Sequence, residues 1–209
     1  MSWTTIVGII VLLLLAGTGI FWGSRYKRVD SVPDQNRSNY QTISQSQPVQ
    51  HGVSGDPMVK YLKMRNRAFD GSRTQYGIPP GSNSTDPWAT VMEIGLADGT
   101  VTIIALADGS TSVYTSSGLF YIGGGEHQSL NAAARRMVAA VREVQPVMHH
   151  TQEYLLPQRG HIVFYALTDS GIFTAAAPQT GFADPNQPMA KLYTLGEQIV
   201  AEYRRIGGK

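Results

Sequence analysis

The sequence predicts an α+β protein: an N-terminal single transmembrane helix, a flexible linker, and one antiparallel-sheet domain with helices packed on it. Three observations lead to this prediction. Residues 1–24 carry no charged side chain and are almost wholly apolar. Farther along, short runs of β-forming residues alternate with Asp-Gly pairs, which favour tight hairpins. Two later segments repeat apolar residues at the spacing of a buried helix face.

These patterns divide the chain into a membrane anchor (1–24), a basic juxtamembrane segment with a disordered linker (25–55) and an α+β domain (56–209). A length of 209 residues suits one domain with an appendage. The net charge of +2 argues against binding nucleic acid by charge alone. The absence of cysteine excludes disulfides, thiol nucleophiles and thiolate metal ligands.

The apolar N-terminal run has the length of a membrane span. A helix over residues 3–22 would be about 30 Å long, which matches the hydrocarbon core of a bilayer. Trp3 and Trp22 lie at its two ends, where aromatic rings prefer the membrane interface. A cleaved secretory signal would need basic residues before the run and a small-residue cleavage site after it, and neither is present. We therefore expect an uncleaved signal-anchor.

Positive charge lies on one side of this run. Arg25, Lys27, Arg28 and Arg37 follow it, and no basic residue precedes it. The positive-inside rule then predicts a single-pass protein of the cell membrane with the N-terminus outside and the C-terminal domain in the cytoplasm. The expected anchor residues are Trp3, Trp22, Arg25, Lys27 and Arg28, with the lipid bilayer as their partner.

The first helix of the domain is expected to begin at Asp56-Pro57, a capping residue followed by proline at the first helical position. Its apolar stripe is Met58, Tyr61, Leu62 and Phe69, with Met64 and Ala68 beside it. Its expected polar side comprises Lys60, Lys63, Arg65, Arg67 and Arg73. Such a helix either lies on anionic lipid or packs on the domain with its charges in water, and we favour the second.

The sheet is expected to contain β-runs in two groups. The first group is 91–96, 101–106, 111–115 and 118–122, and the second is 161–165 and 171–177. A helix capped by Ser129 follows the first group, with this buried face: Leu130, Ala134, Met137, Val138, Val141 and Val144. Another helix follows the second group, with this one: Leu192, Leu195, Ile199, Val200, Tyr203 and Ile206.

The two groups resemble one another in order and in one short motif. The sequence Ala105-Leu-Ala-Asp108 matches Ala166-Leu-Thr-Asp169, and both follow a strand and precede a hairpin. Strand, strand and helix occurring twice suggests halves at 88–145 and 148–207 that share one sheet. Duplication and convergence on one simple unit explain this similarity equally well.

Few residues suggest chemistry. Glu126 and His127 follow the triplet Gly123–Gly125, and with His161 they are the candidate catalytic residues. The triplet fits no phosphate-binding motif, so we interpret it as a strand-to-helix turn. The adjacent pair His149-His150 would point to opposite sides of a strand, which disfavours joint metal binding. Asp98 and Asp108 each precede a glycine, and turn formation accounts for both. We expect no cofactor or metal site.

The leading functional hypothesis is a single-pass membrane protein that presents a small interaction domain as an adaptor or accessory subunit of a membrane-associated complex. Low charge in the domain favours contact with other membrane or membrane-associated proteins. The alternative is a membrane-anchored hydrolase that uses the 123–127 loop and nearby histidines. The hydrolase predicts a cleft where two or more of the following converge: Glu126, His127, His149, His150 and His161. The adaptor predicts an exposed apolar face or sheet edge.

Overall fold

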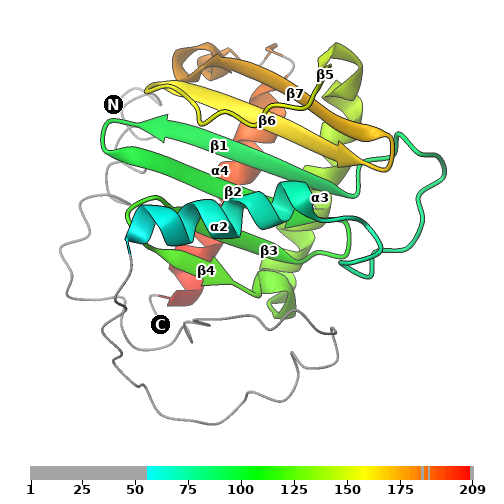
Figure 1. Cartoon of the computed structure of the whole chain (residues 1–209), viewed down its shortest axis with the longest axis horizontal. Helices are drawn as coiled ribbons and strands as arrows, with labels where there is room; N and C mark the ends of the chain where they lie inside the picture. The colour runs from blue at the N-terminus through cyan, green and yellow to red at the C-terminus, as the bar shows by residue number, and fades with distance from the viewer. Residues whose placement is uncertain (1–55, 185, 188, 208–209) are drawn as a thin grey trace, which may run out of the picture.

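A seven-stranded antiparallel sheet lies between one helix on its front face and two helices on its back face (Figure 1). The computed structural model describes residues 56–184, 186–187 and 189–207. This part of the chain is an α+β domain with three α-helices, as the sequence predicts. Among these residues no helix combines the length and apolar character that a bilayer crossing requires. The predicted span, the linker and the anchor residues lie outside the described residues.

The sheet has the order β4-β3-β2-β1-β6-β7-β5, and each neighbouring pair is antiparallel. The strands are β1 (Ala89–Leu96), β2 (Gly99–Leu106), β3 (Thr111–Thr115), β4 (Phe120–Ile122), β5 (His149–Thr151), β6 (His161–Thr168) and β7 (Gly171–Pro178). All six predicted β-runs correspond to strands, and β5 is additional. The central strands β1 and β2 are buried along nearly their whole length because helices cover both faces.

Both predicted Asp-Gly turns are present. Gly99 has a φ of +146° and Gly109 a φ of +90°, values that glycine adopts at little cost. The Asp108 carboxylate accepts hydrogen bonds from the backbone N–H and the hydroxyl of Ser110, at 2.9 and 3.0 Å. This is the turn-stabilising role predicted for Asp108, and it leaves that carboxylate at one end of the β2–β3 connection.

The back face is covered by α3 (Gln128–Val144) and α4 (Ala190–Gly207). The predicted α3 face is buried in full, and every predicted α4 residue is buried or packs against the same core. Helix α3 begins one residue before the predicted cap, so His127 rather than Ser129 is its N-cap residue. The short 3-10 helix η2 (Gly124–Glu126) precedes it and has already turned the chain toward the helix direction.

The front face is covered by α2 (Pro57–Asp70), which begins where the sequence predicts. The Asp56 carboxylate caps it by accepting a hydrogen bond from the backbone N–H of Met58 at 2.9 Å. Tyr61, Ala68 and Phe69 are buried against the sheet, whereas Met58 at the first turn is exposed. Helix α2 therefore packs on the domain, in agreement with the favoured alternative.

Two residues expected on the polar side of this helix are buried instead. Arg65 is only 3% exposed and Arg73 only 7% exposed. The expectation was wrong because it assigned residues to the polar side by their charge and not by their position on the helix. Residue 65 lies one helical turn after Tyr61, on the face that contacts the sheet. A buried guanidinium requires compensating acceptors, and these organise the front face.

The structure gives the short repeat a positional explanation. Ala105 of β2 and Ala166 of β6 both pair with Thr90 of the central strand β1, one on each side. Strand β3 pairs with β2 on the side away from β1, and β7 pairs with β6 on the side away from β1. The matched motifs thus occupy equivalent positions on the two strands that flank β1.

Candidate interaction surface

The front face of the sheet is built around a buried ion pair between α2 and β1. Arg65 donates from Nε to Glu93 Oε1 and from Nη2 to Glu93 Oε2, both at 2.7 Å. Glu93 is fully buried. Burial alone would lower the pKa of Arg65, but the hydrogen bonds and the charge of Glu93 raise it above its usual value. Arg65 is therefore charged, and its contacts with Glu93 fix α2 to the centre of the sheet.

A chain of hydroxyls extends this ion pair. Thr102 Oγ1 donates to Glu93 Oε1 at 2.8 Å and lies 2.7 Å from the Tyr61 hydroxyl. A threonine hydroxyl has one proton, so Tyr61 donates to Thr102 and Thr102 donates to Glu93. Burial and the nearby carboxylate raise the pKa of Tyr61 to about 12, which keeps this phenol protonated. The carboxylate of Glu93 thus has several donors and no exposure to water.

The same guanidinium holds the segment that joins β5 to β6. We call residues 152–160 the strap, because this segment has no helix or strand and crosses the domain between those two strands. Arg65 Nη2 donates to the backbone carbonyl of Tyr154 at 2.7 Å. The Tyr154 ring stacks on Phe69 of α2, with centroids 4.5 Å apart and planes 7° apart. One arginine therefore links helix, sheet and strap.

Two further contacts hold the strap backbone. The Tyr165 hydroxyl donates to the carbonyl of Leu155 at 3.2 Å, and Gly160 donates its N–H to the carbonyl of Gly95 at 2.8 Å. A side chain at position 95 would place its Cβ only 2.1 Å from the carbonyl oxygen of Gln158, so Gly95 is required for this close approach.

The strap presents two leucines to solvent although its backbone is anchored. Leu155 is 72% exposed and Leu156 is 39% exposed. Their neighbour Tyr154 is packed against the front-face core. An anchored backbone with exposed leucines loses little conformational entropy when a partner covers it, which favours binding.

Neither of the two cavities described here brings the candidate catalytic residues together. Glu126 lies in η2, His127 is the N-cap residue of α3, and His161 is the first residue of β6. His149 and His150 lie in β5 as exposed residues. The cavity between the start of α3 and the end of α4 contains only His127 of this set, and the cavity beside the strap contains only His150. Within the described part of the chain, no group of three His, Asp or Glu side chains could hold a metal ion.

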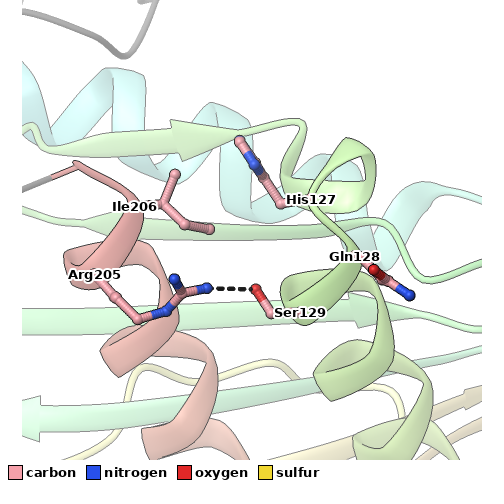
Figure 2. Close-up of a pocket in the computed structure, with 5 residues that line it drawn as sticks. All are labelled: His127, Gln128, Ser129, Arg205 and Ile206. Atoms are coloured by element: carbon pink, nitrogen blue, oxygen red, sulfur yellow. Dashed lines mark hydrogen bonds between the residues drawn. The ribbon is translucent and has the colours of Figure 1, made fainter. Parts of the chain in front are cut away.

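The cavity beside His127 has a volume of about 420 Å³ and is lined by His127, Gln128, Ser129, Arg205 and Ile206 (Figure 2). Arg205 spans it by donating to Ser129 Oγ at 3.0 Å, and it also pairs with Glu202. Figure 2 shows the Gln128 side chain directed away from Arg205. The Arg205 guanidinium in this cavity is thus already paired with the Glu202 carboxylate.

The sequence reasoning missed the residues that build the front face. Glu93, Thr102 and the strap carried no predicted role. A signal for Glu93 was present, because it is an acidic residue inside the otherwise apolar run Val91–Leu96, and such a residue needs a cationic partner when both faces of the strand are buried. A search for that partner would have led to Arg65, the basic residue in register with Tyr61 and Phe69.

Comparisons of the chain with protein-family models, with curated proteins and with solved structures find no match.

Proposed function

We propose that this chain is a single-pass membrane protein that presents its α+β domain as an adaptor or accessory subunit of a membrane-associated complex. The domain lies on the cytoplasmic side of the membrane, at the end of the linker. The uncharged apolar run over residues 1–24 and the basic residues that follow it support the anchor and its orientation. The partner is another membrane or membrane-associated protein.

The observation that carries the interaction role is the strap with its two exposed leucines. Leu155 and Leu156 occupy an anchored backbone that Arg65, Tyr165 and Gly95 hold in place. A protein interface uses adjacent exposed apolar residues of this kind as its apolar centre. The front face around the strap is accordingly the contact surface of the domain.

Site-specific photo-crosslinking in native membranes tests this proposal. A benzophenone amino acid replaces Leu155 in the full chain, and the matched control carries it at Gln198, an exposed residue of α4 on the opposite face. We expect a discrete cross-linked adduct from position 155 and none from position 198. The double change Leu155→Asp and Leu156→Asp should abolish complementation of a deletion strain. Equal cross-linking at both positions, or none at 155, would contradict the proposal.

The orientation is tested separately. A reporter that fluoresces only in the cytoplasm, fused after Lys209, should be bright, and a reporter that is active only outside the cytoplasm should be silent. The reverse result would place the domain on the other side of the membrane.

A further inference from the structure

A second cavity lies next to the strap, where the end of α2, the start of the strap and the β6–β7 turn meet. It has a volume of about 310 Å³, at the lower end of the range of about 300–1,000 Å³ for ligand pockets. This size suits one side chain better than a cofactor. We call it the strap cavity. The lining residues used below are Phe69, Trp88, His150, Tyr154, Asp169 and Ile172.

The walls of the strap cavity combine aromatic and apolar residues with polar ones such as Gln152 and Thr168. Phe69 and Tyr154 stack on one another, and Trp88 packs 5.6 Å from the ring of Tyr76. Ile172 is buried and lines the cavity from β7. The aromatic and apolar part of this wall suits the apolar stem of a ligand, and the Arg65 guanidinium already lies 4.9 Å from the Phe69 ring centroid.

The charged group of the cavity is an accessible carboxylate. Asp169 lies in the β6–β7 turn with its side chain 39% exposed, and Arg73 Nε contacts its two oxygens at 3.1 and 2.8 Å. The other nitrogens of Arg73 donate to the backbone carbonyls of Pro79 and Asp86. A carboxylate accepts about four hydrogen bonds, so Asp169 retains acceptor capacity beyond the single donor group that Arg73 supplies.

Gly171 leaves the space that the His150 side chain occupies at the edge of the cavity. Gly171 has a φ of +132°, and a Cβ at this position would lie 2.4 Å from Nε2 of His150. The His150 ring packs edge-on against Phe173, with centroids 5.7 Å apart. The His150 ring thus borders the cavity from β5.

We propose that the strap cavity binds the cationic end of a lysine or arginine side chain from a partner polypeptide, with its apolar stem against the aromatic walls. Asp169 accepts hydrogen bonds from the ammonium or guanidinium group. An anionic ligand would be repelled by the same carboxylate, and a purely apolar one would leave its acceptors unused. This inference rests on the proposed function, because it names the chemistry of the partner that contacts the strap.

The test uses the full chain in detergent micelles at pH 8, where histidine side chains are in general neutral. Trp3→Phe and Trp22→Phe leave Trp88 as the only tryptophan, and its 5-fluoro analogue then reports occupancy of the cavity by ¹⁹F NMR. The probes are N-acetyl-lysine methylamide, N-acetyl-arginine methylamide and the uncharged N-acetyl-norleucine methylamide. We expect saturable shifts with both cationic probes and at least about fivefold weaker binding of the norleucine probe.

The variant Asp169→Asn should weaken binding of the lysine probe at least about fivefold. The matched control Asp70→Asn, at an exposed carboxylate that does not line the cavity, should not weaken it. If Asp169→Asn fails to fold, the inference is tested by comparing how the lysine and norleucine probes bind the protein that retains Asp169. Equal binding of both probes, or no binding of either cation, overturns the inference.

The cation site and the proposed adaptor function can fail independently of one another. Cross-linking at Leu155 without binding of the cationic probes would retain the adaptor role and overturn the cation site. Binding of the probes without any adduct at Leu155 would support the cation site and contradict the adaptor role.

Discussion

The two faces of the sheet are held by different forces. On the back face, α3 and α4 bury apolar side chains such as Leu130, Met137 and Phe164 in one continuous core. On the front face, α2 adds a smaller aromatic core to the ion pair of Arg65 and Glu93. Apolar packing is tolerant of small shifts in position, whereas a buried charge requires its own partner at one place.

This difference assigns separate roles to the two layers. The back layer supplies most of the apolar burial and therefore most of the stability. The front layer fixes where α2 and the strap lie, because Arg65 contacts Glu93 and the carbonyl of Tyr154 at once. A precise position matters on the front face if the strap is a binding surface.

The largest expected effect concerns the domain as a whole. Residues 56–209 include both layers, so we expect them to fold without the residues that precede them. Urea unfolding followed by circular dichroism should show one cooperative transition. A molten or aggregated product would mean that one of the two layers is incomplete without a partner or lipid.

Removing the arginine of the front face should be the most damaging single change. Arg65→Met leaves Glu93 buried without its cation, at a cost of about 3–5 kcal/mol in the free energy of unfolding. The double variant Arg65→Met with Glu93→Met should recover most of this loss, since an apolar pair can replace a buried ion pair. Lys63→Met, on the exposed side of the same helix, should stay within about 0.5 kcal/mol. A double variant as unstable as the single one would refute this account.

One acidic residue departs from the apolar character of the back layer. Glu197 of α4 has a buried oxygen, Oε2, without a hydrogen-bond partner among the described residues. Burial raises the pKa of Glu197 to about 7, and the charge of Arg204 only partly opposes this. The folded state therefore binds this proton more tightly than the unfolded chain does, and the domain should lose stability as the pH rises from about 4.5 to 7.

The loss over this pH range should amount to about 3 kcal/mol. Glu197→Gln should remove that pH dependence, whereas Glu143→Gln, at an exposed residue paired with Lys191, should retain it. Urea unfolding at a series of pH values measures the effect. A wild-type profile that is flat between pH 4.5 and 7 would show that Glu197 is solvated.

The glycine triplet joins the sheet to the back layer and should show a smaller effect. Gly123 has a φ of +83°, so Gly123→Ala should cost about 1 kcal/mol. A Cβ at Gly124 would lie 2.4 Å from the Tyr203 hydroxyl, which donates to the carbonyl of Thr111, so Gly124→Ala should also destabilise. Gly181→Ala is the control, because open space surrounds that position and its φ is ordinary. Equal stability of all three variants would contradict this interpretation.

The smallest effect is expected at the two exposed candidates of the triplet loop. Glu126→Gln and His127→Ala should change the free energy of unfolding by no more than about 0.5 kcal/mol and should retain function in the cell. A stable His127→Ala protein that keeps its partner contacts but fails to complement a deletion would revive the hydrolase hypothesis.

The back layer could be predicted from the sequence almost residue by residue. Its helices are amphipathic, and periodicity alone identifies faces such as that of Leu130, Met137 and Val141. The front layer could not, because its organising contact joins residues 65 and 93 through space and involves charged side chains, which periodicity assigns to the surface. The strap and its cavity likewise depend on tertiary contacts, with Tyr154 next to Phe69 and Asp169 next to Arg73.

The place where α2 begins has a mechanical consequence. Asp56 and Pro57 lie beside the β3–β4 turn, where a Cβ at Gly118 would contact the Pro57 ring at 3.2 Å. Any tension on the chain from its N-terminal side enters the domain at this point. It would detach α2 from the sheet, starting at the first turn of the helix. The contacts of Tyr61 and then those of Arg65 would resist this before any load reached the back layer. The helix that places the strap therefore also lies between such a load and the main core.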